Sequence, residues 1–347
     1  MKQKIRVAVL GATGTVGQKL LRRLDTHPWF EISALVASPR SVGKRYAEAV
    51  HWLEPVPIPM ACAGMRVQAP EDDLACDLAL SALDRRTAAS VEPEIAGRGI
   101  AIVSNASALR MAPGVPLIVP EVNPDHLEVV ENRTVGRGIV VTNPNCATIG
   151  LVLALKPLVD ACGGIRSVRV TTLQAVSGAG HPGAPSLDIL GNVLPNIPGE
   201  EAKLEEEPQK IFGQVDGGDI RAADFSVSAQ TNRVPVVDGH VLSVAVDLPG
   251  RPDPEEARRI IDGFESAIGD LELPSAPRRP VRVVESPTGP QPRLHCFHNG
   301  GMTVSVGRVR RCPALGLQLV ALVHNTERGA AGAAMLNAEL LLAKGLI

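Results

Sequence analysis

The stretch Lys4-Ile-Arg-Val-Ala-Val-Leu10, followed at once by Gly11-Ala-Thr-Gly14-Thr-Val-Gly17, decides the fold class of this chain. Its first seven residues form a short aliphatic run, which is typical of a buried strand. The glycines predict a tight turn, and residues 15–25 predict a helix. A strand, a glycine turn and a helix start together suit a pyrophosphate, because backbone N–H groups and the positive end of the helix converge there. The GxxGxxG spacing, a variant of GxGxxG, therefore predicts a dinucleotide site that includes Gly11, Thr13, Gly14, Thr15, Val16 and Gly17.

The end of the next predicted strand, residues 31–37, indicates which dinucleotide binds. NAD sites usually carry an acidic residue there, which holds the ribose 2′-hydroxyl. This chain instead continues Ser38-Pro39-Arg40-Ser41, with no carboxylate. The guanidinium of Arg40 and the hydroxyls of Ser38 and Ser41 suit a 2′-phosphate. We therefore predict NADP as the cofactor; the alternative interpretation is a polar surface loop.

Aliphatic runs along the first half predict a parallel sheet. They recur at 77–82, 100–104, 116–119 and 138–142, and several of the gaps between them are long enough for helices. Alternation of strands and helices is typical of a doubly wound parallel sheet.

The second half of the chain has a different pattern. A Gly- and Pro-rich loop is expected at 177–200, and helices at 147–160, 200–212, 253–268 and 327–346. A second sheet, mixed or antiparallel, is expected from the runs at 166–176, 224–230, 240–247, 281–285, 302–309 and 317–323. The predicted fold is α/β: an N-terminal Rossmann-like, doubly wound parallel sheet plus an α+β catalytic and dimerisation domain with a mixed sheet. We expect residues 1–147 and 325–347 to bind NADP, and residues 148–324 to carry catalysis and oligomerisation.

The composition of the 347 residues excludes several classes of partner. The net charge is −2, from 35 basic and 37 acidic residues, and five Phe, two Trp and one Tyr are the only aromatic residues. Neither a basic surface nor a base-stacking platform is therefore expected, so we predict no nucleic-acid or membrane partner. The six cysteines lack CxxC spacing, which indicates reduced thiols, no metal site and a cytoplasmic protein.

One cysteine has a setting that suits catalysis. The segment Asn143-Pro144-Asn145-Cys146 leads from a predicted strand into a helix, which either Asn145 or Asn143 can cap. Cys146 then lies in the first turn, where the helix dipole favours a thiolate and N–H groups can hold an oxyanion. The alternative is a small buried cysteine, as we expect for the other five. A proton shuttle is also needed, and the spacing does not choose between His240 and His181.

Eight segments, taken together and in order, resemble the aspartate-semialdehyde dehydrogenase family, most closely its archaeal and fungal branch. They span nearly the whole chain. The segments are Gly11-Ala-Thr-Gly-Thr-Val-Gly17, Ser104-Asn-Ala-Ser-Ala-Leu-Arg110, Pro120-Glu-Val-Asn123, Asn143-Pro-Asn-Cys-Ala-Thr148, Gln174-Ala-Val-Ser-Gly-Ala-Gly180, Gly199-Glu-Glu-Ala-Lys203, Arg233-Val-Pro-Val-Val-Asp-Gly-His240 and Asn325-Thr-Glu-Arg-Gly-Ala-Ala-Gly332.

The resemblance implies roles for the residues in these segments. Cys146 is the nucleophile, His240 the acid/base, and Gln174 orients the acyl group. The substrate-binding residues are Arg233 for the α-carboxylate, Glu200 for the amino group, Arg110 with Lys203 for the phosphate, and Asn145. Further cofactor contacts are Ser81, Ser177, Gly178, Asn325 and Gly329.

The implied reaction is the NADPH-dependent conversion of L-4-aspartyl phosphate to L-aspartate 4-semialdehyde through a Cys146 thioester, in the biosynthesis of lysine, threonine, methionine and isoleucine. Relatives are homodimers or homotetramers. The alternatives are malonyl-CoA reductase, the more distant N-acetyl-glutamyl-phosphate reductase, and an inactive nucleotide-binding regulatory protein. For Glu200 and Lys203 the alternative is a solvated face, since they lie in a run rich in glutamate.

Overall fold

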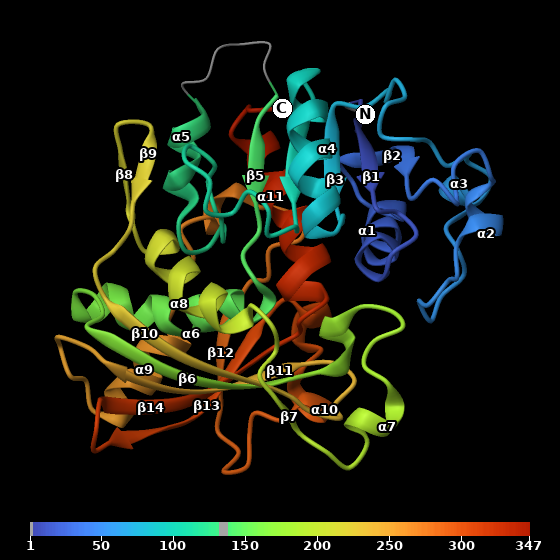
Figure 1. The fold of residues 1–347 in the computed structure, drawn as a ribbon. Helices are drawn as coiled ribbons and strands as arrows, with labels where there is room; N and C mark the ends of the chain where they lie inside the picture. Colours follow the sequence, from blue (N-terminus) through green and yellow to red (C-terminus); the bar gives the residue numbers. More distant parts are fainter. Residues whose placement is uncertain (1–2, 132–137) are drawn as a thin grey trace.

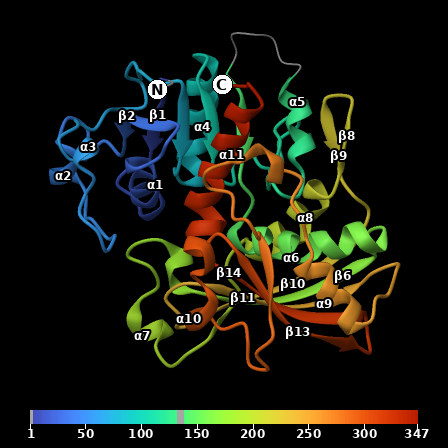
Figure 2. The same ribbon diagram turned by 180° about the vertical axis from the view of Figure 1, so that it is seen from behind.

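The computed structural model describes residues 3–131 and 138–347 and contains two main sheets. Figure 1 shows the first sheet above the second, with α6 (Cys146–Cys162) and α8 (Glu200–Ile211) between them. Figure 2, the reverse view, confirms that both termini lie at the end of the molecule away from the second sheet. The first sheet is parallel and the second is mixed, which confirms the predicted fold class.

The first sheet is wholly parallel, with strand order β2-β1-β3-β4-β5. Segment 116–119 is not one of its strands: Leu117 makes only an isolated bridge to Thr142. Pro116 and Pro120 bracket that segment, and proline cannot donate to a ladder. The five strands are β1 (Ile5–Leu10), β2 (Phe30–Val36), β3 (Leu78–Ser81), β4 (Ala101–Ser104) and β5 (Val140–Thr142).

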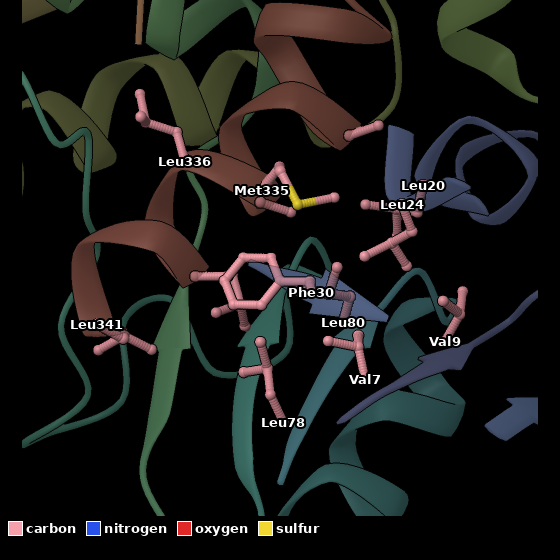
Figure 3. Packing of buried hydrophobic residues seen from close by; sticks show 14 of the residues in the cluster. Val7, Val9, Leu20, Leu24, Phe30, Leu78, Leu80, Met335, Leu336 and Leu341 are labelled. Carbon is pink, nitrogen blue, oxygen red and sulfur yellow. The ribbon is translucent and has the colours of Figure 1, made fainter. Parts of the chain in front are cut away.

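The C-terminal helix α11 (Gly332–Ala343) packs on this first sheet, although it follows the last strand of the second. Figure 3 shows Met335 and Leu341 of α11 among Val7, Phe30 and Leu78, all of them fully buried. The other helices of this part are α1 (Thr15–Asp25), α2 (Tyr46–Ala49), α3 (Met60–Ala63), α4 (Arg85–Gly97), η1 (Pro124–Leu127) and α5 (Glu128–Glu131).

The second sheet has seven strands in the order β12-β13-β14-β11-β6-β10-β7 and is mixed. The pairs β6–β10 and β12–β13 are parallel, whereas the others are antiparallel. The strands are β6 (Ser167–Gln174), β7 (Leu194–Pro195), β10 (Ser226–Arg233), β11 (His240–Asp247), β12 (Val281–Val284), β13 (Val304–Cys312) and β14 (Gly316–Val323).

Helices cover one face of this sheet, and the pattern of β6 shows it. Val168 and Val170 are buried against α6, α8 and α9 (Pro254–Asp262), whereas Arg169 and Leu173 on the other face are exposed. Helix α9 ends before the predicted boundary at 268, with Gly263 as its C-cap.

The remaining elements are short. A hairpin that the sequence did not predict, β8 (Gln214–Asp216) and β9 (Asp219–Arg221), turns at two glycines with positive φ. The segment 177–200 is mostly irregular, as predicted. The other short elements are η2 (Val176–Ala179), α7 (Ser186–Ile189), η3 (Gly269–Leu271), α10 (Pro292–His295), η4 (His298–Gly301) and the π-helical turn η5 (Glu327–Ala331).

Candidate active site

A cleft of about 630 Å³ runs between the glycine turn of the first sheet and the start of α6. Segments from both sheets line it, so the site depends on how the two parts pack. Among the lining residues are Thr13–Val16, Asn105, Arg110, Asn145, Cys146, Ser177–His181, Asn325 and Gly329.

The glycine turn is built for close backbone approach. Gly11 has φ +78°, and a Cβ there would lie 2.6 Å from the carbonyl oxygen of Ala82. A Cβ at Gly17 would overlap the carbonyl oxygen of Gly11. Thus Gly11 and Gly17 shape the turn, and Thr13–Val16 line the cleft. Among residues 3–131 and 138–347 no side chain caps α1, so its N-terminal N–H groups suit an anionic pyrophosphate.

The predicted ribose-phosphate residues lie in the turn after β2. Ser38 and Arg40 are exposed, Ser41 is buried, and the N–H of Ser41 donates to the carbonyl of Ser38 at 2.8 Å. Ser81, by contrast, is fully buried at the end of β3, beside the carboxyl group of Glu92, and does not line the cleft. Strand packing takes its side chain away from the predicted cofactor contact.

Cys146 is the first residue of α6 and lines the cleft. Asn145, not Asn143, caps the helix: its Oδ1 accepts from the N–H groups of Ala147 at 2.9 Å and Thr148 at 3.3 Å. The cap therefore uses two of the N–H groups expected to hold an oxyanion and leaves that of Cys146.

The environment of Cys146 does not favour the thiolate in the ligand-free protein. Desolvation and the negative charge of Glu200 raise the pKa of the thiol to about 12, although Arg110 and Arg233 act in the opposite direction. The N–H of Ala147 at the helix start does act to lower this pKa, but the loss of water and the charge of Glu200 outweigh it.

Sheet register brings three predicted residues to one edge of the second sheet. Gln174 ends β6, Arg233 ends β10, and the two are direct partners in the parallel ladder. His240 begins β11, whose next residue pairs with Leu173. All three side chains are buried, and Arg233 donates to the carbonyl of Ala175 at 2.8 Å.

His240 is held in one tautomer. Its Nδ1 accepts from the N–H of Ala175 at 3.0 Å, so the proton of the neutral ring lies on Nε2. Within the described ranges Nε2 has no hydrogen-bond partner. Burial and the charge of Arg233 lower the pKa of His240 to about 3, so the ring is neutral near pH 7. His181 instead is exposed at the cleft, with its ring centroid 5.3 Å from that of His51.

Two glycines allow the reactive groups to approach the loops of the cleft. A Cβ at Gly178 would lie 2.8 Å from Nη1 of Arg233 and 3.2 Å from Nε2 of His240. A Cβ at Gly329 would lie 2.5 Å from that of Cys146. His240, Arg233 and Cys146 therefore surround the part of the cleft that these glycines line.

A chain of polar contacts joins α8 to the start of α6. Glu200 accepts from Lys203 Nζ at 2.7 Å and from Asn145 Nδ2 at 2.7 Å. Glu207 accepts from the N–H of Asn145 at 2.7 Å and from Arg110 Nη1 at 2.8 Å. Glu200 and Glu207 are buried, so the alternative of a solvated face does not hold for Glu200, whereas Lys203 is half-buried.

Glu207 was missed from the sequence, although it lies seven residues after Glu200 and so on the same helix face. Lys210 was missed as well, although it lies seven residues after Lys203 on the same helix.

Asn325 connects the predicted cofactor loop with the histidine segment. Its Oδ1 accepts from the N–H of Gly239 at 2.9 Å, and its Nδ2 donates to Ser177 Oγ at 2.8 Å. It thus supports Ser177 and the residue before His240 while lining the cleft itself.

Two classes of feature are not found in residues 3–131 and 138–347. No helix there is long and apolar enough to cross a membrane. No group of three or more His, Cys, Asp or Glu residues in these ranges could hold a metal ion.

Family models match both parts of the chain. The model described as semialdehyde dehydrogenase, NAD binding domain, matches residues 6–130, and its dimerisation-domain counterpart matches residues 155–328. An aspartate-semialdehyde dehydrogenase of Archaeoglobus fulgidus is 48% identical over 98% of this chain and 99% of its own. The chain belongs to the aspartate-semialdehyde dehydrogenase family.

This member of the aspartate-semialdehyde dehydrogenase family is similar to fungal proteins as well as to archaeal ones. The Schizosaccharomyces pombe aspartate-semialdehyde dehydrogenase is 43% identical over 99% of both chains. A crystal structure of the Candida albicans enzyme with NADP has a TM-score of 0.93 at 41% identity, covering 99% of this chain and 100% of that one. The predicted family and its archaeal and fungal branch are confirmed.

Proposed function

We propose that this protein catalyses the NADPH-dependent reductive dephosphorylation of L-4-aspartyl phosphate to L-aspartate 4-semialdehyde, through a thioester on Cys146. The observation that carries the proposal is that Cys146 and the glycine turn line one cleft. A nucleophile and a hydride donor can therefore meet the same carbonyl carbon. The curated relatives are named for this activity, which confirms the predicted enzyme class and disfavours the alternatives.

NADP fits the first domain of this chain. Gly11 and Gly17 permit the tight turn, no side chain of the described residues caps the N–H groups of α1, and Arg40 lies exposed after β2. The predicted cofactor is confirmed, because the Candida albicans neighbour was solved with NADP. When bound, NADPH supplies the hydride that reduces the thioester.

Acylation begins at Cys146. The thiol gives up its proton as its sulfur attacks the acyl carbon. The S–C bond forms, the bond from that carbon to the phosphate oxygen breaks, and the departing phosphate takes up the proton. Arg110 and Lys203 neutralise the departing phosphate. Glu200 raises the pKa of the thiol, so a substrate ammonium group on Glu200 would offset that charge and favour the thiolate as the substrate binds.

His240 acts at the oxygen of the reacting carbonyl. Its Nε2–H donates to that oxygen as negative charge develops there, beside the remaining N–H of the α6 start. Collapse of the hemithioacetal breaks the C–S bond, releases the aldehyde and returns the Cys146 thiolate. A neutral ring with its proton on Nε2 suits this role as a donor.

The substrate is oriented by the buried polar groups around Cys146. We assign the α-carboxylate to Arg233, the acyl group to Gln174, and the amino group to Glu200 with Asn145. Arg233 and Gln174 are adjacent in the ladder, and Asn145 bonds to Glu200, so each pair presents its groups together.

The assembly is a homodimer or homotetramer in the cytoplasm, with residues 1–147 and 325–347 as the NADP-binding domain and 148–324 as the catalytic and oligomerisation domain. A dimerisation-domain model matches the second part. The uncovered face of the second sheet, which includes exposed Leu173, suits a second subunit.

The experiment that tests the function compares substrates. NADP reduction is measured with aspartate semialdehyde and phosphate, and NADPH oxidation with malonyl-CoA. We expect phosphate-dependent turnover in the first assay and little in the second. Strong turnover with malonyl-CoA alone would overturn the proposal.

A further inference from the structure

We infer that Glu207 is a positioning residue that fixes the phosphate-binding Arg110 relative to the helix that carries Cys146. The inference rests on the proposed function, since it assigns Glu207 to the phosphate step of that reaction. Its evidence is a set of buried contacts made by α8 with the Arg110 segment and with the start of α6.

One carboxylate holds both parts of the site. Glu207 is 2% exposed, and its Oε1 accepts from Arg110 Nη1 at 2.8 Å. Its Oε2 accepts from the N–H of Asn145 at 2.7 Å, and Asn145 caps the helix that begins with Cys146. The leaving-group cation and the nucleophile are thus held through two oxygens of a single side chain.

Lys210 fixes the backbone of the same arginine. Its Nζ donates to the carbonyl of Arg110 at 2.7 Å, to that of Val115 at 2.8 Å and to that of Ala112 at 3.3 Å. Glu207 and Lys210 are three residues apart and share one face of α8. The helix therefore holds Arg110 at its guanidinium and at its carbonyl.

The anchoring leaves part of the guanidinium available. Arg110 Nη1 and Nη2 are occupied by Glu207 and by the carbonyl of Asn105 at 2.7 Å, whereas Nε is buried with no partner among the described residues. Arg110 is 7% exposed and lines the cleft. A guanidinium fixed at two points presents its remaining donors in one direction, which suits an oxyanion of phosphate.

The position requires two acceptor oxygens. Both partners of Glu207 are donors, so a carboxylate satisfies both, whereas a glutamine has one acceptor and one NH₂ group. In Glu207→Gln one contact becomes donor against donor, with almost no change in volume. Glu207→Asp keeps both acceptors on a shorter side chain. Glu206, its exposed neighbour on α8, offers a matched control in Glu206→Gln.

The test measures KM for phosphate and for NADP separately, in the direction that consumes aspartate semialdehyde. For Glu207→Gln we expect the KM for phosphate to rise and kcat/KM to fall by about tenfold to a hundredfold, as for a lost hydrogen bond to a charged group. The KM for NADP should stay within about twofold, Glu206→Gln should match the wild type, and Glu207→Asp should recover part of the loss. Merely structural damage would change both KM values or lower the active fraction.

A second measurement does not depend on turnover. Inorganic phosphate should slow the alkylation of Cys146 by iodoacetamide, and Glu207→Gln should raise the phosphate concentration for half-protection by at least about tenfold. In an Arg110→Met background the same change should have little further effect, because Glu207 acts through Arg110.

The outcomes separate the two proposals. A wild-type protein without phosphate-dependent turnover contradicts the proposed function, and the alkylation assay then still tests Glu207. An active wild type whose Glu207→Gln variant keeps the same phosphate KM and the same protection overturns the inference. So does an equal rise in both KM values in a folded variant.

Discussion

The two ends of the cleft are built in different ways. At the cofactor end, one contiguous segment, residues 11–17, makes the turn, and the predicted phosphate contact Arg40 is exposed. At the chemical end, Cys146, Gln174, Arg233 and His240 come from the ends of four separate elements, and the last three are buried. The proposed cofactor site thus depends on local backbone geometry, and the proposed catalytic site depends on the topology that brings strand and helix ends together.

The difference in burial has an energetic consequence. A charge or donor at the open end keeps contact with water, so its loss costs only the contact itself. A buried group at the chemical end leaves its partners unsatisfied when it is removed. We therefore expect larger effects from substitutions at the chemical end, and the predictions below test this order.

The largest effect is expected at Cys146. Cys146→Ser should lower kcat by roughly four orders of magnitude or more, because a serine hydroxyl in this site is a far weaker nucleophile. Thermal unfolding should remain within a few degrees of the wild type. A variant with full activity would contradict the assignment of the nucleophile.

The next largest effect is expected where the backbone approaches Cys146, the proposed nucleophile. Gly329→Ala places a Cβ 2.5 Å from that of Cys146, so the chain must shift there, and kcat should fall by roughly 10²-fold. Gly97→Ala, in α4 with open space around it, is the matched control and should leave kcat unchanged. Equal activity of the two variants would show that the close contact at Gly329 is unimportant.

A smaller effect is expected at the open end. Arg40→Glu should raise the KM for NADPH by about tenfold to a hundredfold while changing that for NADH far less, since only NADPH carries the 2′-phosphate. Steady-state kinetics with both cofactors measures the ratio. Equal changes for the two cofactors would remove Arg40 from the 2′-phosphate site.

The smallest effect is expected at the exposed His181. His181→Ala should keep kcat within about twofold, as for most surface changes, whereas His240→Asn should lower it by roughly 10²-fold. The two variants are compared in the same assay at pH 7. A large loss in His181→Ala with an active His240→Asn would reverse the choice of histidine.

The fold was predictable because its signals are local. The aliphatic run before Gly11, the glycines themselves and the helix after them place β1 and α1 within one residue of their observed bounds. Cys146 at a helix start was equally visible, because asparagine caps helices for a local reason. The prediction of a strand at 116–119 was wrong because hydrophobicity alone does not reveal whether the neighbouring prolines permit a ladder of hydrogen bonds.

The site was predictable only where a short motif carries the chemistry. Ser81 follows the strand pattern, but packing buries its side chain beside Glu92. Glu207 and Lys210 looked like part of a charged surface, because their partners Asn145 and Arg110 lie 62 and 100 residues away along the chain.

The sequence by itself determined the parallel sheet, the dinucleotide turn and a cysteine at the start of a helix. Each of these follows from residues that are neighbours in the chain. Only the tertiary structure decided the tautomer of His240, the high pKa of Cys146 and the contacts of Glu207. These depend on burial and on groups far apart in sequence, and desolvation acts on a side chain only once the two sheets and α8 have packed around it.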